Sequence, residues 1–381
     1  MKILHIGKYY WPIPGGIETA VRDIAVEQVR QGHSVSVLSH WDGPGKNATQ
    51  EVCEGVQVIR MPILGHVAHA PIAPRFPRIF QTIVSQNAPD IIHIHMPNLS
   101  PLWMVVFRGK TPIIVHWHSD VFTSLKSLPL TLLYPGYAIL QNLLLRKASA
   151  IIATSRYYQE ASKPLQSFQD KTVTIPLALD PARMTQVRHV TKEQDSFDSR
   201  KLVLSVGRFT YYKGFDVLVQ AAAHLGEDTK VIIAGDGPLR PRIQDRIARL
   251  QLSDRVFLPG RLSDQELHAL MAQCSVFCLP SVDRTEAFGL VLLEAMYYAR
   301  PLVSTRVWGS GMQLVNEHGV TGFCVEPEDD RALGKALEFL LAYPKETQAM
   351  GEAGKKRVGS MFHIANQVRQ FNELYARLQA S

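Results

Sequence analysis

Cysteine is scarce in this sequence, and none of its four cysteines is placed as metal ligands usually are. Cys274 and Cys278 are four residues apart, but no second pair follows them, and Cys53 and Cys324 stand alone. Zinc-binding modules place two such pairs at short spacings. We therefore expect these residues to be buried free thiols.

Long apolar segments are also absent. The nearest candidate, Pro129–Leu145, is interrupted by Pro135, Gly136, Gln141 and Asn142, whereas a membrane-spanning helix needs about 20 consecutive apolar residues. The first residues, Met-Lys-Ile-Leu, lead directly into a strand pattern instead of the apolar core of a signal peptide. We expect a cytoplasmic protein.

Basic residues outnumber acidic ones, but they do not form long runs. The formal net charge is +7, from 41 Lys and Arg against 34 Asp and Glu. Such a surplus can attract nucleic acid, an anionic membrane surface or an anionic substrate. Because the sequence has no run of five Lys or Arg and no aromatic RNA-reading motif, we expect no nucleic-acid partner.

Two motifs of nucleotide-dependent enzymes are missing as well. An Asp-x-Asp pair, which would hold a metal ion against a diphosphate, occurs nowhere in the sequence, so we expect neither a metal site nor a cofactor. Neither half of the chain has Gly-x-Gly-x-x-Gly after its first strand, which argues against a nicotinamide-dependent dehydrogenase.

The sequence does contain a repeated alternation of short apolar strands and amphipathic helices. A strand pattern at Lys2–Gly7 precedes a helical period from Ile17 to Gly32 and a second strand pattern at Ser34–Ser39, which is the order of a βαβ unit in a parallel sheet. Further strands are predicted at Asp90–His95, Pro112–His118, Ala150–Ser155, Val173–Pro176, Leu202–Gly207, Lys230–Gly235, Val256–Leu258, Val276–Leu279, Pro301–Ser304 and Gly322–Val325.

A chain of 381 residues is long enough for two domains. A polar stretch without apolar periodicity separates the two series of strands. We predict an α/β fold in which two doubly wound, Rossmann-like domains face a central cleft. The predicted boundaries are 1–183 for the first domain, 184–200 for a linker, 201–362 for the second domain and 363–381 for a terminal helix.

The most specific motif is the acidic pair formed by Glu286 and Glu294. It follows the strand that ends at Leu279, and a helix is predicted to begin at Phe288-Gly289-Leu290. The N-terminal amides of such a helix suit a diphosphate. Glu286 would then point toward a sugar attached to that phosphate, and Glu294, about two turns deeper, could reach a ribose hydroxyl.

Other motifs follow other predicted strands. Arg208 and Lys213 lie after the first strand of the second half, where two cations could clamp a pyrophosphate or could simply be solvated. The segment Gly235-Asp236-Gly237-Pro238 could approach a ligand or form only a tight turn. The same alternatives hold for Gly15-Gly16, after the first strand of the chain.

Histidines are concentrated in the first half. His118 and Asp120 end a predicted strand, where they could act on a sugar hydroxyl or on the reacting centre. His93, His95 and His116 lie nearby in the chain and raise the question of a metal cluster. All three lie inside predicted strands, and His93 and His95 alternate with isoleucine there. We therefore interpret them as residues of the core or of the cleft wall.

Taken together, five motifs resemble glycosyltransferase family 4, the retaining enzymes with the GT-B fold. The resemblance covers nearly the whole chain, and the order and spacing of the motifs make it specific. The motifs are Pro14–Glu18, His116–Asp120, Val206–Arg208 with Tyr212–Gly214, Gly235–Pro238 and Glu286–Glu294.

The resemblance implies a role for each matched residue. The residues near the reacting centre would be His118, Asp120 and Glu286. The donor would be held by the diphosphate-binding Arg208 and Lys213, the ribose-binding Glu294, the amides of Phe288, Gly289 and Leu290, the nucleobase-facing Arg261, Leu262 and Asp264, and the glycines Gly15, Gly16, Gly235 and Gly237. The terminal helix, from Ile364, would cross back to the first domain.

The resemblance also implies the chemistry. Front-face attack, with the leaving diphosphate accepting the proton of the acceptor, would retain the anomeric configuration without the two flanking carboxylates of retaining hydrolases. We expect a hexosyltransferase of bacterial lipopolysaccharide or exopolysaccharide synthesis that acts on a lipid-linked or oligosaccharide acceptor. Mannose from GDP-mannose is the first choice of donor, with UDP-glucose, UDP-galactose, UDP-N-acetylglucosamine and dTDP-rhamnose left open.

Two surfaces of the first domain combine basic and apolar residues, Phe122–Lys147 and His66–Arg78. Either could rest on an anionic membrane or be ordinary packed structure. If they bind lipid, the protein would be peripheral on the inner face of the cytoplasmic membrane.

Two other activities are compatible with this architecture. A nucleotide-sugar 2-epimerase would use a donor without an acceptor, and a non-catalytic nucleotide-sugar-binding protein would be expected to lack Glu286 or the phosphate-binding cations.

Overall fold

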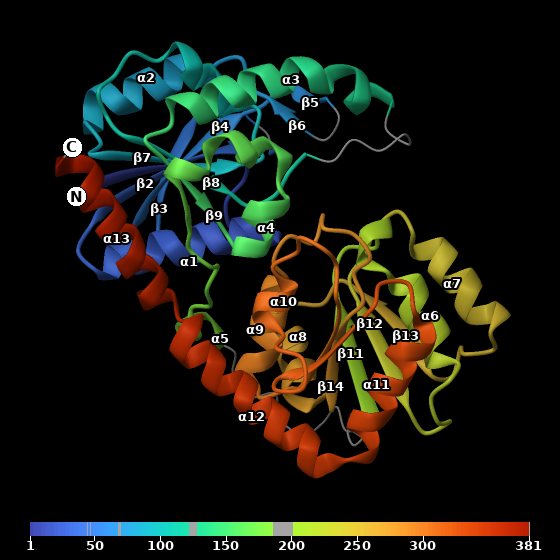
Figure 1. Cartoon of the computed structure of the whole chain (residues 1–381). Helices are drawn as coiled ribbons and strands as arrows, with labels where there is room; N and C mark the ends of the chain where they lie inside the picture. The colour runs from blue at the N-terminus through green and yellow to red at the C-terminus, as the bar shows by residue number, and fades with distance from the viewer. Residues whose placement is uncertain (44, 46, 68–69, 122–127, 186–200, 381) are drawn as a thin grey trace. The chain divides into compact units, whose positions relative to one another are not determined.

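The chain folds into two compact units, each an α/β structure with its own mostly parallel sheet (Figure 1). The computed structural model describes residues 1–43, 45, 47–67, 70–121, 128–185 and 201–380. The first unit consists of Met1–Leu177 and Ile364–Ser381, and the second of Ala178–His363. The predicted α/β class, with a Rossmann-like sheet in each half of the chain, is confirmed. Most of the predicted linker, residues 186–200, lies outside the described residues.

The first unit is built on an eight-stranded sheet with the order β10-β9-β8-β7-β1-β2-β4-β3. All neighbouring strands are parallel except β3, which runs antiparallel to β4. The strand order reverses between β1 and β7, where ligands of doubly wound sheets usually bind. The strands are β1 Lys2–Ile6, β2 Ser34–Trp41, β3 Thr49–Cys53, β4 Val56–Pro62, β7 Ile91–Met96, β8 Ile113–Trp117, β9 Ala150–Ala153 and β10 Thr172–Thr174, with a separate pair β5 Gly65–Val67 and β6 Ala70–Ile72.

Helices cover both faces of this sheet. Helices α1 and α13 lie together on one face, and α2 and α3 lie on the other (Figure 1). Because the central strands are covered on both sides, every residue of β7, β8 and β9 is buried, including the histidines of β7 and β8. The helical segments are α1 Gly16–Arg30, α2 Phe76–Asn87, η1 Ser100–Val106, α3 Leu128–Lys147, α4 Arg156–Ala161, η2 Lys163–Lys171 and α13 Ile364–Ala380.

The second unit has a six-stranded parallel sheet with the order β13-β12-β11-β14-β15-β16. This is the order of a dinucleotide-binding Rossmann sheet, and its direction of winding reverses between β11 and β14. The strands are β11 Leu202–Val206, β12 Lys230–Ala234, β13 Val256–Gly260, β14 Val276–Leu279, β15 Leu302–Thr305 and β16 Gly322–Val325.

The core of the second unit joins the sheet to helices α6, α7 and α11. The helical segments of this unit are α5 Pro181–Thr185, η5 Tyr211–Lys213, α6 Phe215–Ala222, α7 Arg240–Arg249, α8 Asp264–Gln273, α9 Leu290–Tyr297, α10 Met312–Val315, α11 Asp330–Ala342 and α12 Pro344–Met361. In the part of the chain that the structure describes, no helix is both long enough and apolar enough to cross a membrane.

Candidate functional site

The predicted donor-binding residues of the second unit lie on loops at the carboxyl edge of its sheet. Backbone hydrogen bonds join these loops. The amide of Gly207, after β11, donates to Ala234 at the end of β12, and the amide of Gly235 donates to Gly260 at the end of β13. The loops after neighbouring strands are therefore held side by side, which is where an open α/β sheet binds its ligands.

Lys213 and Glu286 meet at the point where this sheet reverses its order. Lys213 follows β11 and Glu286 follows β14, which are adjacent strands. The Nζ atom of Lys213 lies 2.5 Å from Oε2 of Glu286, and their side chains are only 11% and 13% exposed. The structure thus forms one ion pair from two residues 73 positions apart, both of them predicted site residues.

This ion pair keeps the lysine charged. Burial would lower the pKa of Lys213, but the neighbouring Glu286 carboxylate, with which it forms a hydrogen bond, outweighs burial and raises that pKa. Lys213 is therefore a fixed positive charge at neutral pH, as stabilisation of a leaving diphosphate requires. The stem of the lysine is also confined, because a Cβ added to Gly207 would lie 2.8 Å from its Cε atom.

The loop that carries Glu286 is held in place by the loop after β15. The Ser310 hydroxyl donates to the Glu286 carbonyl at 2.6 Å, and the Gly311 amide donates to the Ala287 carbonyl at 2.7 Å. Both bonds fix the backbone and leave the Glu286 side chain to its ion pair with Lys213. Sequence reasoning missed Ser310 and Gly311, because neither belongs to a recognisable motif.

Helix α9 begins directly after this loop. Gly289 is its N-cap residue in the left-handed conformation (φ 79°), and a Cβ there would lie 2.9 Å from Leu292. Leu290 is the first helical residue, whereas Phe288 is buried and packs edge-on against Phe362. The first amides of a helix have no partner within the helix, so this N-terminus can hold an anion.

Glycine is required at the end of β12. Gly235 has φ 130°, and a Cβ on it would lie 2.0 Å from the Gly207 carbonyl. A Cβ on Gly237 would lie 2.7 Å from the Phe209 backbone. The close packing of the loops after β11 and β12 thus accounts for glycine at these two predicted donor-binding positions. Their contact with a ligand stays a prediction.

The predicted nucleobase loop follows β13. Arg261 and Asp264 are exposed and Leu262 is half-buried, and Asp264 is the first residue of α8, after the capping residue Ser263. Arg208 is likewise exposed, one residue beyond Gly207 on the loop after β11. All four therefore stand on the same edge of the sheet as Lys213, where their predicted contacts with a donor stay predictions.

Glu294 has a partner that the sequence did not reveal. Arg183, on α5, donates from Nη2 to Oε1 of Glu294 at 2.8 Å, and the two side chains are 15% and 12% exposed. Arg183 lies just before residues 186–200 and belongs to no motif, so no pattern pointed to it. Any ribose bound by Glu294 would share its carboxylate with this arginine.

In the first unit, Gly15 and Gly16 form the start of helix α1. Gly15 is the N-cap residue and Gly16 the first helical residue. The Glu18 carboxylate folds back over this end, because a Cβ on Gly15 would lie 2.1 Å from its Oε2 atom. Burial raises the pKa of Glu18. A diphosphate that approached these glycines would have to displace or neutralise this carboxylate.

His118 and Asp120 follow β8 and are both buried. The Oδ1 atom of Asp120 accepts hydrogen bonds from Trp117 Nε1 at 2.9 Å and from Ser162 Oγ at 2.6 Å. These bonds show that Asp120 fixes the loop after β8. A direct part in catalysis stays a prediction, as it does for His118, whose Nε2 atom is hydrogen-bonded to His95.

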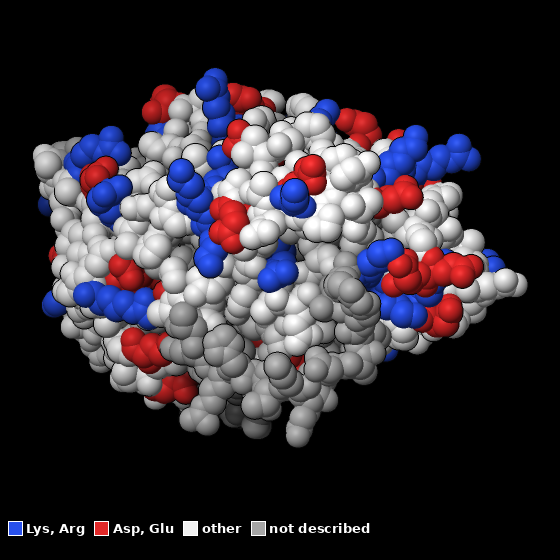
Figure 2. Space-filling view, turned by 90° about the horizontal axis from the view of Figure 1, so that it is seen from below, with Lys and Arg blue, Asp and Glu red and all other residues white. Residues whose placement is uncertain are grey.

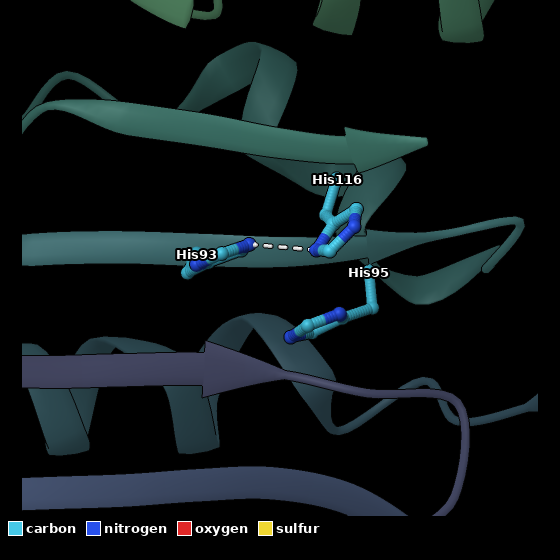
Figure 3. Close-up of side chains that lie close together, drawn as sticks. All are labelled: His93, His95 and His116. Carbon is cyan, nitrogen blue, oxygen red and sulfur yellow. Dashed lines mark hydrogen bonds between the residues drawn. The ribbon is translucent and has the colours of Figure 1, made fainter. Parts of the chain in front are cut away.

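The neighbouring histidines are core residues, as expected. His93, His95 and His116 are at most 1% exposed, and one nitrogen from each lies within 4.8 Å of the others (Figure 3). A metal site needs ring nitrogens with free lone pairs directed at one point. However, both nitrogens of His95 are engaged in hydrogen bonds with His5 and His118. The arrangement favours a hydrogen-bonded cluster over a metal site.

Charges on the surface are mixed where they can be seen. On the face shown in Figure 2, Lys and Arg side chains alternate with Asp and Glu side chains. The described residues on that face therefore show no single basic patch, and such a patch is what nucleic-acid binding would need.

Comparison with known proteins identifies relatives for both halves. The family described as "Glycosyl transferases group 1" matches residues 188–357, and the "Glycosyl transferase 4-like domain" matches residues 15–178. The O-antigen chain mannosyltransferase C of Escherichia coli is 30% identical over 383 residues, which is 100% of both chains. The D-rhamnosyltransferase WbpZ of Pseudomonas aeruginosa is 31% identical over 278 residues, 72% of this chain and 70% of that protein.

Solved structures share the fold. Sucrose-phosphate synthase of Thermosynechococcus elongatus superposes with a TM-score of 0.82 at 23% identity, covering 100% of this chain and 99% of that one.

The buried histidines predict that acid destabilises the first unit. Burial lowers the pKa of His5 to about 4 and that of His118 to about 3, and it lowers the pKa of His93, His95 and His116 as well. As the pH falls below about 6.5, the unfolded chain binds protons that the folded unit does not. Each histidine should then reduce the free energy of unfolding by on the order of 1 kcal/mol per pH unit, down to about pH 4.

Hydrogen exchange measured by mass spectrometry tests this expectation. Protection factors, corrected for the intrinsic pH dependence, should fall for β1, β7 and β8 between pH 6.5 and 4.5, and fall less for β12, which contains no histidine. Constant protection of β1, β7 and β8 across this range would show that the histidines do not resist protonation.

Proposed function

This chain belongs to the group 1 glycosyltransferases, whose family 4 members have the GT-B fold, and we propose that it is a retaining hexosyltransferase of bacterial surface-polysaccharide synthesis. The observation that carries the proposal is the buried ion pair between Lys213 and Glu286 at the point where the second sheet reverses its order. Nucleotides bind at such points, and the charged lysine suits a nucleotide sugar's diphosphate.

The proposed reaction is a front-face displacement. Lys213, Arg208 and the first amides of α9 stabilise the negative charge that develops on the departing diphosphate. An oxygen of that diphosphate accepts the proton of the attacking hydroxyl group, which joins the sugar on the face from which the diphosphate leaves. Glu286 holds Lys213 and contacts the transferred sugar. Because protein cations serve the diphosphate, the reaction proceeds without a metal ion or cofactor.

The proposed donor is GDP-mannose, and the proposed acceptor is a lipid-linked or free oligosaccharide in O-antigen or lipopolysaccharide synthesis. This choice is supported by the full-length similarity to a protein named O-antigen chain mannosyltransferase C. A relative named D-rhamnosyltransferase WbpZ keeps a nucleotide-linked rhamnose as the next donor to examine.

A peripheral membrane contact is proposed for the surface of helix α3. Its exposed apolar residues combine with those of η1, which packs against α3; they are Leu132, Leu133, Ile139, Leu140, Leu143, Trp103 and Val106. Arg108, Lys110 and Arg146 are exposed near them in the chain, and Asp120, the single acidic residue between Ile91 and Lys147, is buried. Apolar and basic residues without exposed acids suit an anionic membrane.

Of the predicted lipid-facing segments, His69 and Lys126 lie outside the described residues. The proposed surface therefore does not depend on them.

A panel of nucleotide sugars tests the choice of donor. GDP-mannose should raise the thermal unfolding midpoint most, since a ligand at 100 times its dissociation constant adds about 2.7 kcal/mol to stability. EDTA should leave this shift unchanged. A larger shift with UDP-glucose, UDP-galactose, UDP-N-acetylglucosamine or dTDP-rhamnose would contradict the donor, and loss of the shift in EDTA would contradict metal independence.

Two substitutions test the diphosphate site. Arg208→Ala and Lys213→Ala should each lower the transfer rate by about 10²-fold or more, because each removes a preorganised charge from the leaving group. Arg331→Ala and Lys335→Ala, which remove exposed cations of helix α11, serve as matched controls and should leave the rate unchanged. Wild-type turnover in both site variants, with thermal midpoints showing that they are folded, would refute the role.

Sedimentation with anionic liposomes tests the membrane surface. The wild-type protein should pellet with the liposomes at low salt. Leu132→Glu and Ile139→Glu should each weaken binding by about ten-fold or more, since each places a charge against the membrane where the wild-type protein has an apolar side chain. Val52→Glu provides the control, because Val52 is as exposed as Leu132, at 75% against 72%, but lies on strand β3. If the wild-type protein stays in the supernatant, this surface does not bind lipid.

A further inference from the structure

One face of the first sheet carries a connected set of buried polar side chains. We refer to it as the histidine network. Its members are no more than 3% exposed and lie between the sheet and helices α1 and α13; they are His5, His93, His95, His116, His118, Gln28 and Tyr375. Several of the rings also stack, with centroids 4.1 Å apart for His116 and His118 and 4.7 Å apart for His93 and His95.

The first arm of the histidine network runs from Gln28 to His118. The Oε1 atom of Gln28 lies 2.7 Å from His5 Nε2, and His5 Nδ1 lies 2.9 Å from His95 Nε2. His95 Nδ1 then lies 2.9 Å from His118 Nε2. The arm ends at His118 Nδ1, which is buried and has no hydrogen-bond partner among the described residues.

The second arm runs from Gln28 to His116 through Tyr375. The Nε2 atom of Gln28 lies 3.2 Å from the Tyr375 hydroxyl, which is 2.6 Å from His93 Nδ1. His93 Nε2 is 3.3 Å from His116 Nδ1 (Figure 3). This arm ends at His116 Nε2, a second buried nitrogen without a hydrogen-bond partner in the described part of the chain.

The direction of each bond in these arms is coupled to the next. A neutral imidazole has one nitrogen that donates and one that accepts, and burial lowers the pKa of all five histidines, so that they are neutral at physiological pH. Fixing the first bond of an arm therefore fixes every later bond, including the tautomer of the last histidine.

The distances around Tyr375 fix the first bond. Hydroxyl donors form short bonds, whereas N–H donors to oxygen are usually longer. The 2.6 Å contact with His93 is therefore the bond that the Tyr375 hydroxyl donates, and the 3.2 Å contact is the one it accepts from the Gln28 amide. The amide nitrogen of Gln28 thus faces Tyr375, and its oxygen, which can only accept, faces His5.

From these directions we infer that Gln28 is a positioning residue that sets the tautomer of His118 through His5 and His95. His5 donates to Gln28, His95 donates to His5, and His118 donates from Nε2 to His95. His118 is thereby left with an unprotonated Nδ1, which can accept a hydrogen bond from a hydroxyl group of a sugar substrate. A half-turn of the Gln28 amide would reverse every bond and place a proton on Nδ1. The substrate contact, but not the tautomer, rests on the proposed function.

Nitrogen NMR of the full-length protein, labelled with ¹⁵N in histidine, tests this assignment. The His118 resonance is identified by its loss in His118→Asn. In the wild-type protein, His118 Nδ1 should show the shift of an unprotonated, pyridine-type nitrogen and Nε2 that of a protonated one. The reverse pattern in the wild-type protein would overturn the inference.

Variants distinguish positioning from packing. Gln28→Met and Tyr375→Phe remove the groups that fix the direction, and both should give His118 a mixture of tautomers. Phe371→Leu is the control, because Phe371 packs edge-on against His93 and His116 without a hydrogen bond to them; it should lower stability and leave the tautomer of His118 unchanged. A single wild-type tautomer in Gln28→Met would also overturn the inference.

A kinetic measurement separates this inference from the proposed function. If His118 contacts the substrate through Nδ1, Gln28→Met should lower kcat/KM in proportion to the share of molecules that carry the other tautomer. The decrease is about two-fold when the two tautomers of His118 are equally populated. Phe371→Leu should leave kcat/KM unchanged. Because the NMR experiment needs no substrate, an inactive wild-type protein with the expected shifts would contradict the proposed function alone.

Discussion

A buried ion pair lies where the second sheet reverses its strand order. Lys213 and Glu286 come from loops after two adjacent strands, β11 and β14, between which the order of the sheet reverses, and they meet at 2.5 Å with little exposure to solvent. A lysine in such a position stays charged because its carboxylate partner outweighs the effect of burial. The backbone around the pair is fixed by Ser310 and Gly311, and α9 begins three residues beyond Glu286 at its cap Gly289. The sheet thus collects a cation, a carboxylate and a helix N-terminus at one edge.

Much of this could be predicted because the relevant information is local in the sequence. Apolar strands followed by turn-forming residues predicted the parallel strands of both units apart from β4, which pairs in parallel with β2, and predicted strands such as Val276–Leu279 agree with the structure at both ends. The motifs on the loops then followed from the rule that ligands bind at the carboxyl edge. The hairpin of β3 and β4 was not predicted, because β3 is exposed and lacks a regular apolar alternation, although its Glu54-Gly55 turn with two positive φ values is a usable indication.

The parts that could not be predicted are pairings between distant residues. Arg183 binds Glu294, 111 positions away along the chain, and Gln28 binds Tyr375, 347 positions away. Neither Arg183 nor Gln28 belongs to a sequence motif that would have indicated its partner. The sequence did suggest that the strand histidines were core residues, but periodicity could not show that they form one hydrogen-bonded set. That required the register of β1, β7 and β8, which places His5 beside His93 and His95 beside His116. The same register makes the interior of the first sheet polar and titratable where most parallel sheets are apolar.

The most direct test of the central claim is a crystal structure of the protein with a nucleotide sugar bound. The diphosphate oxygens should lie within hydrogen-bond distance, about 2.7–3.2 Å, of Lys213 Nζ and of the first amides of α9, with the sugar against Glu286. A diphosphate bound elsewhere on the molecule, with the Lys213–Glu286 pair touching no part of the donor, would contradict the account.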